Sequence, residues 1–356
     1  MNILLCSVPF RPSVGGIETV SALLAEEFRR RGHAVTLVTQ TLLAEGAGLE
    51  PDAPDAPELY PVVRRPGPVR LFELVRQADV VLHNNISLRL AWPLLVLRRP
   101  WVVAHHTWIP RAGAGRLAGL VKLAALRLAR NVAVSHAVAA ALPVHCPVIP
   151  NPYAHRLFRR IGGIERRRDV AFLGRLVSDK GVPVLLQALA ALRERGLTAS
   201  ASIIGQGPEE ASLRAQARQF GIADSVAFSG RLVGEELVRT LNAHRIVVVP
   251  SLWEEPFGLV ALEALACGCI PLVAASGGLP EAAGPAGVVF ARGDSAALAE
   301  RLAALLAVPV LPALAERPDP AVLHHLEQHR PERVAAAYLG FLGDALGKHR
   351  SLARAS

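Results

Sequence analysis

The chain has 356 residues, of which 51% are hydrophobic and 19% charged. This length exceeds the usual size of a single hydrophobic core, so we expect two domains, and the hydrophobic content excludes a disordered chain. The net charge of +9 indicates a surface that attracts phosphates, anionic lipid or nucleic acid, although an arginine-rich composition accounts for part of it. Aromatic residues make up only 5% and do not gather around Lys and Arg, which argues against nucleic-acid binding.

Strands and helices alternate along the first half of the chain. The predicted elements are strands at 3–8, 34–39, 80–83, 102–105 and 132–135 and helices at 17–31 and 115–130. In the first helix Val20, Leu24 and Phe28 share one face, as in a helix that packs on a sheet. Residues 45–68 are rich in Pro, Asp and Gly and predict a long loop. This alternation predicts a parallel α/β sheet.

Residues 147–168 contain Pro150-Asn151-Pro152 and then a basic segment with glycines, which predicts a hinge between two domains. A second alternation follows the hinge. Its predicted elements are strands at 170–173, 199–204, 226–228, 246–249, 270–274 and 288–290 and helices at 182–193, 208–220, 235–243, 258–267 and 296–306. We therefore expect an α/β protein with two Rossmann-like doubly wound domains, at 1–155 and 165–330, facing a central cleft. Ligands of such sheets bind beyond the carboxyl ends of the strands.

The four cysteines, Cys6, Cys146, Cys267 and Cys269, are too few and scattered for a disulfide framework, which favours a reducing compartment. Cys267 and Cys269 lack a partner at metal-ligand spacing, so we interpret them as packing residues and expect no metal site. The apolar N-terminus lacks the features of a signal peptide, and no stretch approaches the roughly 18 uncharged residues of a transmembrane helix. We expect a cytoplasmic protein. Its expected partners include the anionic surface at the inner face of the membrane.

Glu255 and Glu263 stand eight positions apart around the start of the predicted helix at 258–267. The unpaired backbone N–H groups and positive dipole of a helix N-terminus suit a diphosphate. Glu263 lies among apolar residues, where an ionised group is costly unless it is paired or bound to a ligand. The two carboxylates indicate recognition of a nucleotide sugar, and the alternative is a pair of ordinary helix glutamates.

Three further motifs lie where a predicted strand leads into a helix. Gly15-Gly16-Ile17-Glu18 and Gly205-Gln206-Gly207-Pro208-Glu209 lack a complete G-x-G-x-x-G fingerprint, and turn glycines would explain them as well. In Gly174-Arg175-Leu176-Val177-Ser178-Asp179-Lys180-Gly181, Arg175 and Lys180 are expected at the carboxyl edge of the sheet. Two cations there suit a diphosphate and would offset the charge on a leaving nucleotide; solvated loop charges are the alternative.

Together with Ser276-Gly277-Gly278-Leu279-Pro280-Glu281, these motifs resemble the retaining glycosyltransferases of family 4, which have the GT-B fold. The resemblance runs from the first strand to the last third of the chain. It implies transfer of a hexose-type sugar from a nucleotide diphosphate donor, such as a UDP- or GDP-sugar, with retention at the anomeric carbon and without an essential metal. It also implies a final helix, within 331–356, that returns to the first domain.

The resemblance assigns roles to individual residues. Glu255 would hold hydroxyls of the donor sugar, and Glu263 the nucleotide ribose. Arg175 and Lys180 would neutralise the diphosphate. The remaining donor-binding residues would act through glycine turns or backbone N–H groups, and they are Gly15, Gly16, Gly205, Phe257, Gly258, Leu259 and Val260.

On the acceptor side, His106 in Ala104-His105-His106-Thr107 matches the family's histidine near the reacting sugar, and a core or loop position is the alternative. Asn151-Pro152 departs from the family pattern, in which Gly usually follows the Asn, and this weakens Asn151 as a site residue.

Residues 115–131 carry Arg116, Lys122, Arg127 and Arg130, with Leu123 and Leu126 inside the same arc of the predicted helix. Cations among leucines suit an anionic membrane and hence a lipid-linked acceptor in polysaccharide or glycolipid assembly. A buried helix whose arginines reach the surface is the alternative. A dinucleotide-dependent oxidoreductase would need the complete glycine fingerprint, which is missing. A nucleotide-sugar binding protein without catalytic activity remains the alternative function.

Overall fold

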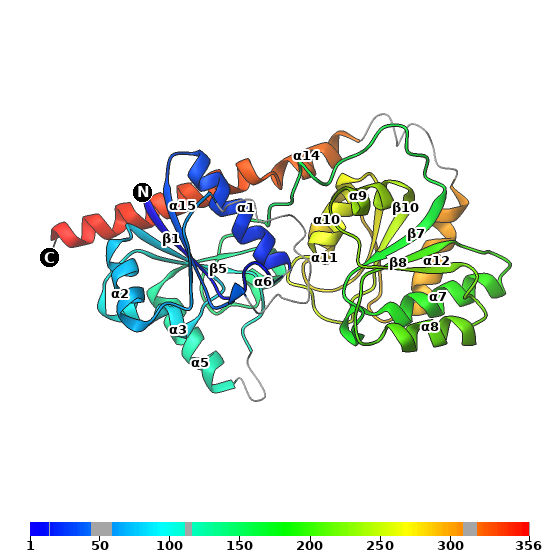
Figure 1. The fold of residues 1–356 in the computed structure, drawn as a ribbon, viewed down its shortest axis with the longest axis horizontal. Helices are drawn as coiled ribbons and strands as arrows, with labels where there is room; N and C mark the ends of the chain where they lie inside the picture. Colours follow the sequence, from blue (N-terminus) through cyan, green and yellow to red (C-terminus); the bar gives the residue numbers. More distant parts are fainter. Residues whose placement is uncertain (14, 44–58, 111–115, 309–318, 356) are drawn as a thin grey trace. The chain divides into compact units, whose positions relative to one another are not determined.

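The computed structural model describes residues 1–13, 15–43, 59–110, 116–308 and 319–355. The chain divides into two compact units (Figure 1). Unit 1 comprises Met1–Pro152 together with His329–Ser356, and unit 2 comprises Tyr153–Gln328. Each unit has its own parallel sheet, and the predicted Rossmann-like α/β class is confirmed for both.

Unit 1 contains a six-stranded sheet with the order β3-β2-β1-β4-β5-β6. The strands are β1 (Asn2–Ser7), β2 (Ala34–Thr39), β3 (Val62–Arg64), β4 (Val80–Asn84), β5 (Trp101–His105) and β6 (Arg130–Ala133). The central strands β1 and β4 are apolar runs that are buried almost throughout, as expected of a parallel sheet covered by helices. The order reverses between β1 and β4, and ligands of such sheets bind near this point.

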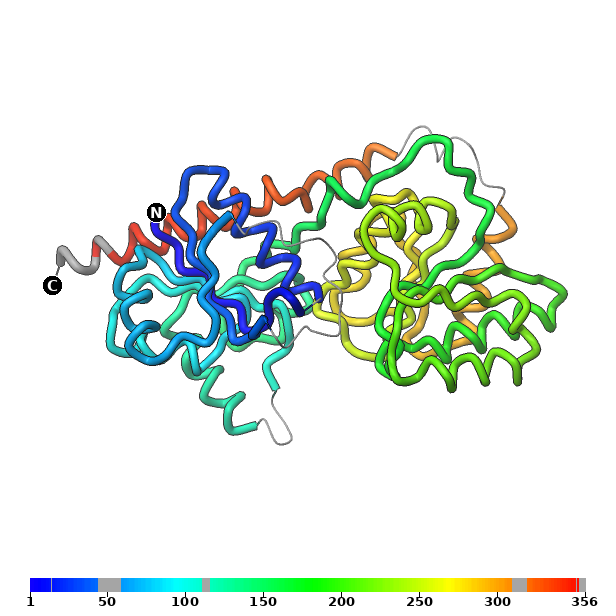
Figure 2. Tube along the Cα trace, in the orientation of Figure 1, coloured from blue at the N-terminus to red at the C-terminus, as the bar shows by residue number. Residues whose placement is uncertain are grey.

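The helices of unit 1 form two groups. Helices α1 (Gly16–Arg30) and α15 (Pro331–Ala355) pack against each other, and α15 also contacts β4 and β5, so the end of the chain joins its beginning in one unit (Figure 2). A second group shares one hydrophobic core with the sheet. It consists of α2 (Pro68–Gln77), α3 (Leu88–Ala91), α4 (Pro93–Val96), α5 (Arg116–Ala125) and the 3-10 turn η3 (Leu126–Leu128). The short α6 (His136–Ala140) follows β6.

Unit 2 repeats this plan with the strand order β12-β11-β10-β7-β8-β9. Its strands are β7 (Arg168–Leu173), β8 (Ala201–Ile204), β9 (Val226–Gly230), β10 (His244–Val249), β11 (Ile270–Ala274) and β12 (Val288–Phe290). Its helices and 3-10 turns are η4 (Ser178–Lys180), α7 (Val182–Glu194), α8 (Glu210–Gln219), α9 (Gly234–Asn242), α10 (Leu259–Ala266), α11 (Leu279–Ala283), η5 (Gly284–Ala286), α12 (Ser295–Ala307) and α14 (Pro320–Gln328). The order reverses between β7 and β10, so the loops after these two strands flank the expected ligand edge.

The elements predicted from the sequence are present, but several short elements were not predicted and one helix was predicted too long. The strands at 34–39, 270–274 and 288–290 have the predicted bounds, and most other elements differ by a few residues at their ends. The sequence did not indicate β3, α2, α3, α4, α6, α11 or α14. Residues 45–58 of the predicted loop at 45–68 lie outside the described residues, and β3 occupies part of the remainder.

The helix predicted at 115–130 was too long. It ends as α5 at Ala125, continues as η3, and gives way to β6 at Arg130. The side-chain amide of Asn131 donates to the carbonyl oxygens of Leu126 and Ala129, at 2.9 and 3.1 Å, and so occupies acceptors that a continuing helix would use.

Candidate functional site

Lys180 and Glu255 form an ion pair at the carboxyl edge of the unit 2 sheet. Lys180 closes η4 after β7, and Glu255 lies in the loop after β10, so the strand ends bring together residues 75 positions apart. The Nζ of Lys180 lies 2.5 Å from the Oε1 of Glu255, and the side chains are 23% and 15% exposed. The hydroxyl of Ser251 donates to the same carboxylate oxygen at 2.9 Å. A cation and a carboxylate are therefore held side by side, partly accessible.

The loops that carry this pair are fastened to each other through the backbone. The N–H groups of Leu252 and Trp253 donate to the carbonyl oxygen of Asp179, at 2.9 and 3.0 Å. The N–H of Gly278 donates to the carbonyl oxygen of Glu255 at 2.8 Å. The hydroxyl of Ser276 donates to the carbonyl oxygen of Trp253. The loops after β7, β10 and β11 therefore form one connected layer.

Glycines make this layer possible because the backbones approach too closely for a side chain. A Cβ on Gly277, whose φ is +52°, would lie 2.0 Å from the carbonyl oxygen of Glu255. A Cβ on Gly205 would lie 1.8 Å from the carbonyl oxygen of Gly174. Gly205 thus packs on the loop that leads to Arg175, which gives it a structural role beside the predicted role in donor binding.

Helix α10 begins at Leu259, separated by one residue from Glu255-Pro256-Phe257. Gly258, in the left-handed region with φ +108°, is the residue before the helix, and Leu259 and Val260 form its first turn. The side chain of Phe257 is 4% exposed and anchors the entry to the helix in the core. The start of a helix at this edge offers backbone N–H groups and positive potential to an anion.

Glu263 and Arg175 complete the predicted donor residues of unit 2. Glu263 lies within α10, and burial raises the pKa of its carboxyl from 4.5 to about 7. Arg175 follows β7 and is exposed to solvent. Both come from elements that reach the same edge of the sheet as Lys180 and Glu255.

In unit 1, His105 and His106 follow one another at the end of β5 and have different environments. The Nε2 of His105 lies 3.0 Å from the Oδ1 of Asn131, whose amide group is itself bonded to two carbonyl oxygens. The Nδ1 of His106 lies 3.0 Å from the Oδ1 of Asn151, whereas its buried Nε2 has no hydrogen-bond partner. His105 is thus a satisfied core residue, and His106 retains one unused ring nitrogen.

Gly15 and Gly16 stand at the start of α1 in unit 1. Gly15 precedes the helix in an extended conformation, and Gly16 is its first residue. The carboxylate of Glu18 closes over this turn, because it accepts from the hydroxyl of Ser13 at 2.8 Å and would lie 2.6 Å from a Cβ on Gly15. The expected contact of these glycines with a diphosphate remains a prediction.

Sequence reasoning missed several residues that hold the candidates in place. In unit 2, Ser251 contacts Glu255, and its position directly after β10 and Pro250 was the available signal. In unit 1, Asn85 and His329 hold the surroundings of His106, and nothing in the sequence pointed to either.

Of the two interpretations of residues 115–131, the structure favours the buried helix over the lipid-facing arc for Leu123 and Leu126. Leu126 is fully buried and Leu123 partly buried against the core of unit 1. Arg130 lies in β6, where its guanidinium stacks on the ring of Phe341 at 4.2 Å. A different arc of α5 faces solvent, and its apolar members are Leu117, Leu120 and Val121, which are 77%, 53% and 47% exposed.

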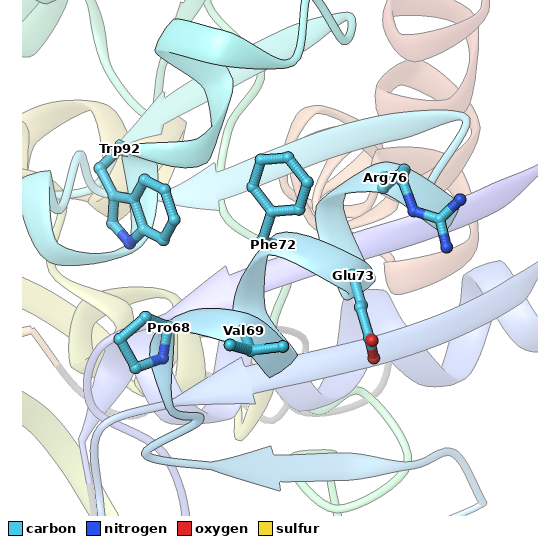
Figure 3. A pocket seen from close by; sticks show the side chains of 6 residues that line it. All are labelled: Pro68, Val69, Phe72, Glu73, Arg76 and Trp92. Carbon is cyan, nitrogen blue, oxygen red and sulfur yellow. The ribbon is translucent and has the colours of Figure 1, made fainter.

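A second apolar surface lies on α2 and α4 of the same unit. The rings of Phe72 and Trp92 are stacked with centroids 6.1 Å apart, and Val69 beside them is 75% exposed. They line an open hollow of about 410 Å³ together with Pro68, Glu73 and Arg76 (Figure 3). Leu95 and Val96 of α4 are also exposed, at 66% and 67%.

Within the described residues, no helix combines the length and the hydrophobicity needed to cross a bilayer. No group of three or more His, Cys, Asp or Glu side chains that could hold a metal ion occurs among them. Cys267 and Cys269 are buried, with exposures of 0% and 2%.

Residues 14–154 match the family described as Glycosyltransferase Family 4, and residues 155–319 match the family described as Glycosyl transferases group 1. The chain is 38% identical over 159 residues to D-inositol 3-phosphate glycosyltransferase from Salinispora arenicola, across 42% of this chain and 35% of that protein. It is 36% identical over 169 residues to the GDP-mannose-dependent alpha-(1-6)-phosphatidylinositol monomannoside mannosyltransferase from Mycolicibacterium smegmatis, across 45% of this chain and 44% of that protein. The matches span less than half the length of these relatives.

Among solved structures, HepE from Anabaena in complex with UDP and glucose is similar, with a TM-score of 0.76 over 96% of this chain and 99% of that one. Its sequence is 21% identical, so this similarity concerns the fold.

Proposed function

Because this chain belongs to the family 4 glycosyltransferases, we propose that it transfers a hexose-type sugar from a nucleotide diphosphate donor to a hydroxyl acceptor, with retention at the anomeric carbon. The observation that carries the proposal is the Lys180–Glu255 pair at the carboxyl edge of unit 2. A cation for phosphate and an acceptor for hydroxyls are the two groups that a nucleotide sugar requires at its diphosphate–sugar junction.

When the nucleotide sugar binds, two new contacts replace the ion pair between Lys180 and Glu255. Lys180 turns to the diphosphate, and Glu255 accepts hydrogen bonds from the sugar hydroxyls. Each charged group then exchanges one charged or polar partner for another, so neither is left unpaired in a partly buried position. In the free protein the pair keeps both side chains at the edge of the sheet, which reduces the ordering required on binding.

The remaining donor contacts follow from the elements around the pair. The first turn of α10, from Gly258 to Val260, binds the diphosphate through backbone N–H groups, and Arg175 adds a second cation. Glu263 accepts from the ribose hydroxyls. Positive groups at the diphosphate stabilise the negative charge that develops as the nucleotide leaves, and positioning of the acceptor hydroxyl supplies the rest. We propose that Gly15 and Gly16 bind the diphosphate and that His106 contacts the reacting sugar.

The test is donor turnover by purified protein with a panel of UDP-, GDP- and ADP-sugars. Slow hydrolysis of one donor is expected, and Lys180→Ala and Glu255→Ala should each reduce it by about 10²-fold or more. Arg167→Ala is the matched control, because it removes an ion pair with Glu165 whose side chains are 82% and 70% exposed. Near-normal turnover by both site variants would overturn the assignment, and donor binding without turnover would favour the non-catalytic binding protein.

We further propose a saccharide or lipid-linked acceptor in polysaccharide or glycolipid assembly of the cell envelope, with the enzyme cytoplasmic and peripheral at the inner face of the membrane. The distribution of charge supports this. Residues 65–130 contain eleven Lys and Arg and two Asp and Glu, which amounts to the whole net charge of +9. The other 290 residues contain 28 of each sign. A surplus of positive charge in this segment of unit 1 suits an anionic membrane.

Exposed apolar side chains gather in the same segment. Of the 17 exposed large hydrophobic residues in the described part of the chain, eight lie within 65–130. They are Val69, Trp92, Leu95, Val96, Leu117, Leu120, Val121 and Leu128. Apolar groups among cations are the composition of surfaces that insert into the interface of an anionic bilayer.

Vesicle flotation tests the lipid proposal. The protein should float with vesicles that contain phosphatidylglycerol and much less with phosphatidylcholine alone. The double variant Leu117→Ser/Leu120→Ser should weaken the association, whereas Leu197→Ser, at a 45% exposed position of unit 2, should not. Equal association with both lipids, or no effect of the double variant, would contradict the proposal.

A further inference from the structure

The ring of His106 is held by one side chain and leaves one nitrogen unused. Its Nδ1 lies 3.0 Å from the Oδ1 of Asn151, and both residues are buried, with exposures of 6% and 7%. The Nε2 is buried and has no hydrogen-bond partner. A buried polar atom without a partner is costly, so its retention in this position points to a ligand.

The contact with Asn151 determines which nitrogen carries the proton. An amide oxygen only accepts hydrogen bonds, so the Nδ1 of His106 must carry a hydrogen. Burial lowers the pKa of His106 to about 4, and the ring is therefore neutral at pH 7. In this tautomer the Nε2 presents a lone pair and acts as a hydrogen-bond acceptor.

The backbone of His106 is fixed independently of its ring. The Oδ1 of Asn85 accepts from the N–H groups of His106 and Thr107, at 2.7 and 3.1 Å. Asn85 itself has a positive φ of 63°, which is uncommon for a residue other than glycine. The ring of His106 is thus held by Asn151 and its main chain by Asn85. Together the two asparagines fix the direction in which the lone pair of the Nε2 points.

Asn151 is in turn held by a residue from the far end of the chain. The Nδ1 of His329 donates to the backbone carbonyl oxygen of Asn151 at 2.9 Å, and His329 is 5% exposed. The chain leaves unit 1 after Pro152 and returns to it at His329. This hydrogen bond therefore joins the point of exit to the point of return.

We propose that Asn151 is a positioning residue that fixes His106 as the Nδ1–H tautomer, so that the Nε2 accepts a hydrogen bond from a sugar hydroxyl during transfer. His329 supports Asn151 by holding its backbone. The proposal rests on the sugar-transfer function, but its structural part, the tautomer, can be measured without any substrate. The neighbouring His105 provides an internal comparison, because the Oδ1 of Asn131 accepts from its Nε2 and requires the opposite tautomer.

The first measurement is a long-range ¹H–¹⁵N nuclear magnetic resonance spectrum of the free protein, with signals assigned by His105→Gln and His106→Gln variants. His105 should be protonated at Nε2 and His106 at Nδ1. In Asn151→Leu, which removes the acceptor, the His106 signal should change to the Nε2–H form while the His105 signal stays. A wild-type His106 protonated at Nε2 would overturn the proposal, whatever the activity of the protein.

The second measurement is turnover of the donor and acceptor pair. Asn151→Leu should lower kcat by about 10²-fold while the donor KM changes by less than about threefold, because the lost contact acts on the reacting sugar. Asn151→Asp keeps an acceptor oxygen in the same place and should restore the Nδ1–H tautomer and much of kcat. Unchanged kcat in a folded Asn151→Leu variant, or no recovery in Asn151→Asp, would overturn the catalytic role. Absence of turnover in the wild type would instead count against the sugar-transfer function.

Discussion

Replacing Gly277 by alanine should damage activity through the backbone of a neighbouring loop. A Cβ at this position would lie 2.0 Å from the carbonyl oxygen of Glu255, and real Cβ contacts essentially never fall below 3.0 Å. The two loops must therefore separate by about 1 Å, and the hydrogen bond from the N–H of Gly278 to the same oxygen opposes that movement. Glu255 is displaced from Lys180 as a result.

The size of the effect follows from this displacement. A misplacement of about 1 Å in a catalytic constellation costs on the order of 10²-fold in rate. Backbone strain alone costs this variant about 1 kcal/mol of stability, because alanine is strained at a φ of +52°, and the contact with Glu255 adds to that loss. For a domain of this size the strain alone corresponds to a fall in melting temperature of about 2–4 °C. Initial rates of donor turnover per folded protein and circular dichroism melts measure the two quantities.

Gly221→Ala is the matched control. Gly221 also lies in unit 2 with a positive φ of 65°, but a Cβ there would meet no atom within 4 Å. This variant should lose only the roughly 1 kcal/mol that comes from backbone strain and should keep the wild-type rate. If Gly277→Ala is as active as Gly221→Ala, the coupling between the two loops does not control the site and the reasoning is refuted.

Two further predictions concern buried polar groups. Burial raises the pKa of Glu263 from 4.5 to about 7, so the stability associated with its neutral form is lost as pH rises from about 4.5 through 7. In urea unfolding, the free energy of unfolding of Glu263→Gln should therefore match that of the wild type near pH 4.5 and exceed it at pH 8. A wild type more stable than this variant at pH 8 would contradict the prediction. Tyr338 is 1% exposed and its hydroxyl has no hydrogen-bond partner, so Tyr338→Phe should raise the free energy of unfolding by about 1 kcal/mol. A loss of stability would indicate a partner for that hydroxyl.

The sequence was informative where one local rule governs the outcome. The apolar runs such as Ile270–Ala274 predicted strands because buried parallel strands tolerate few polar residues. The positions of Lys180 and Glu255 at strand ends predicted their presence at one edge of the sheet. Their ion pair could not be predicted, because it depends on how closely two loops approach. The contact between His106 and Asn151 is of the same kind, since it joins residues 45 positions apart.

Helix α5 shows a different limit. Leu123 and Leu126 fall on one arc, but Leu117, Leu120 and Val121 form a second apolar arc with the same helical spacing. Periodicity alone does not distinguish an inward arc from an outward one when both are apolar. The choice is made by the neighbouring helices and the sheet, which cover Leu126 completely and leave Leu117 at 77% exposure.

The backbone contacts among the loops after β7, β10 and β11 bear on how this protein could be re-engineered. Asp179 accepts from Leu252 and Trp253, and Glu255 accepts from Gly278, so each loop supplies hydrogen-bond partners to the next. A single loop grafted from a relative would arrive without matching partners and would leave buried N–H and carbonyl groups unsatisfied. Exchange of donor preference should therefore succeed only when residues 178–181, 251–258 and 275–279 are transplanted together as one cassette.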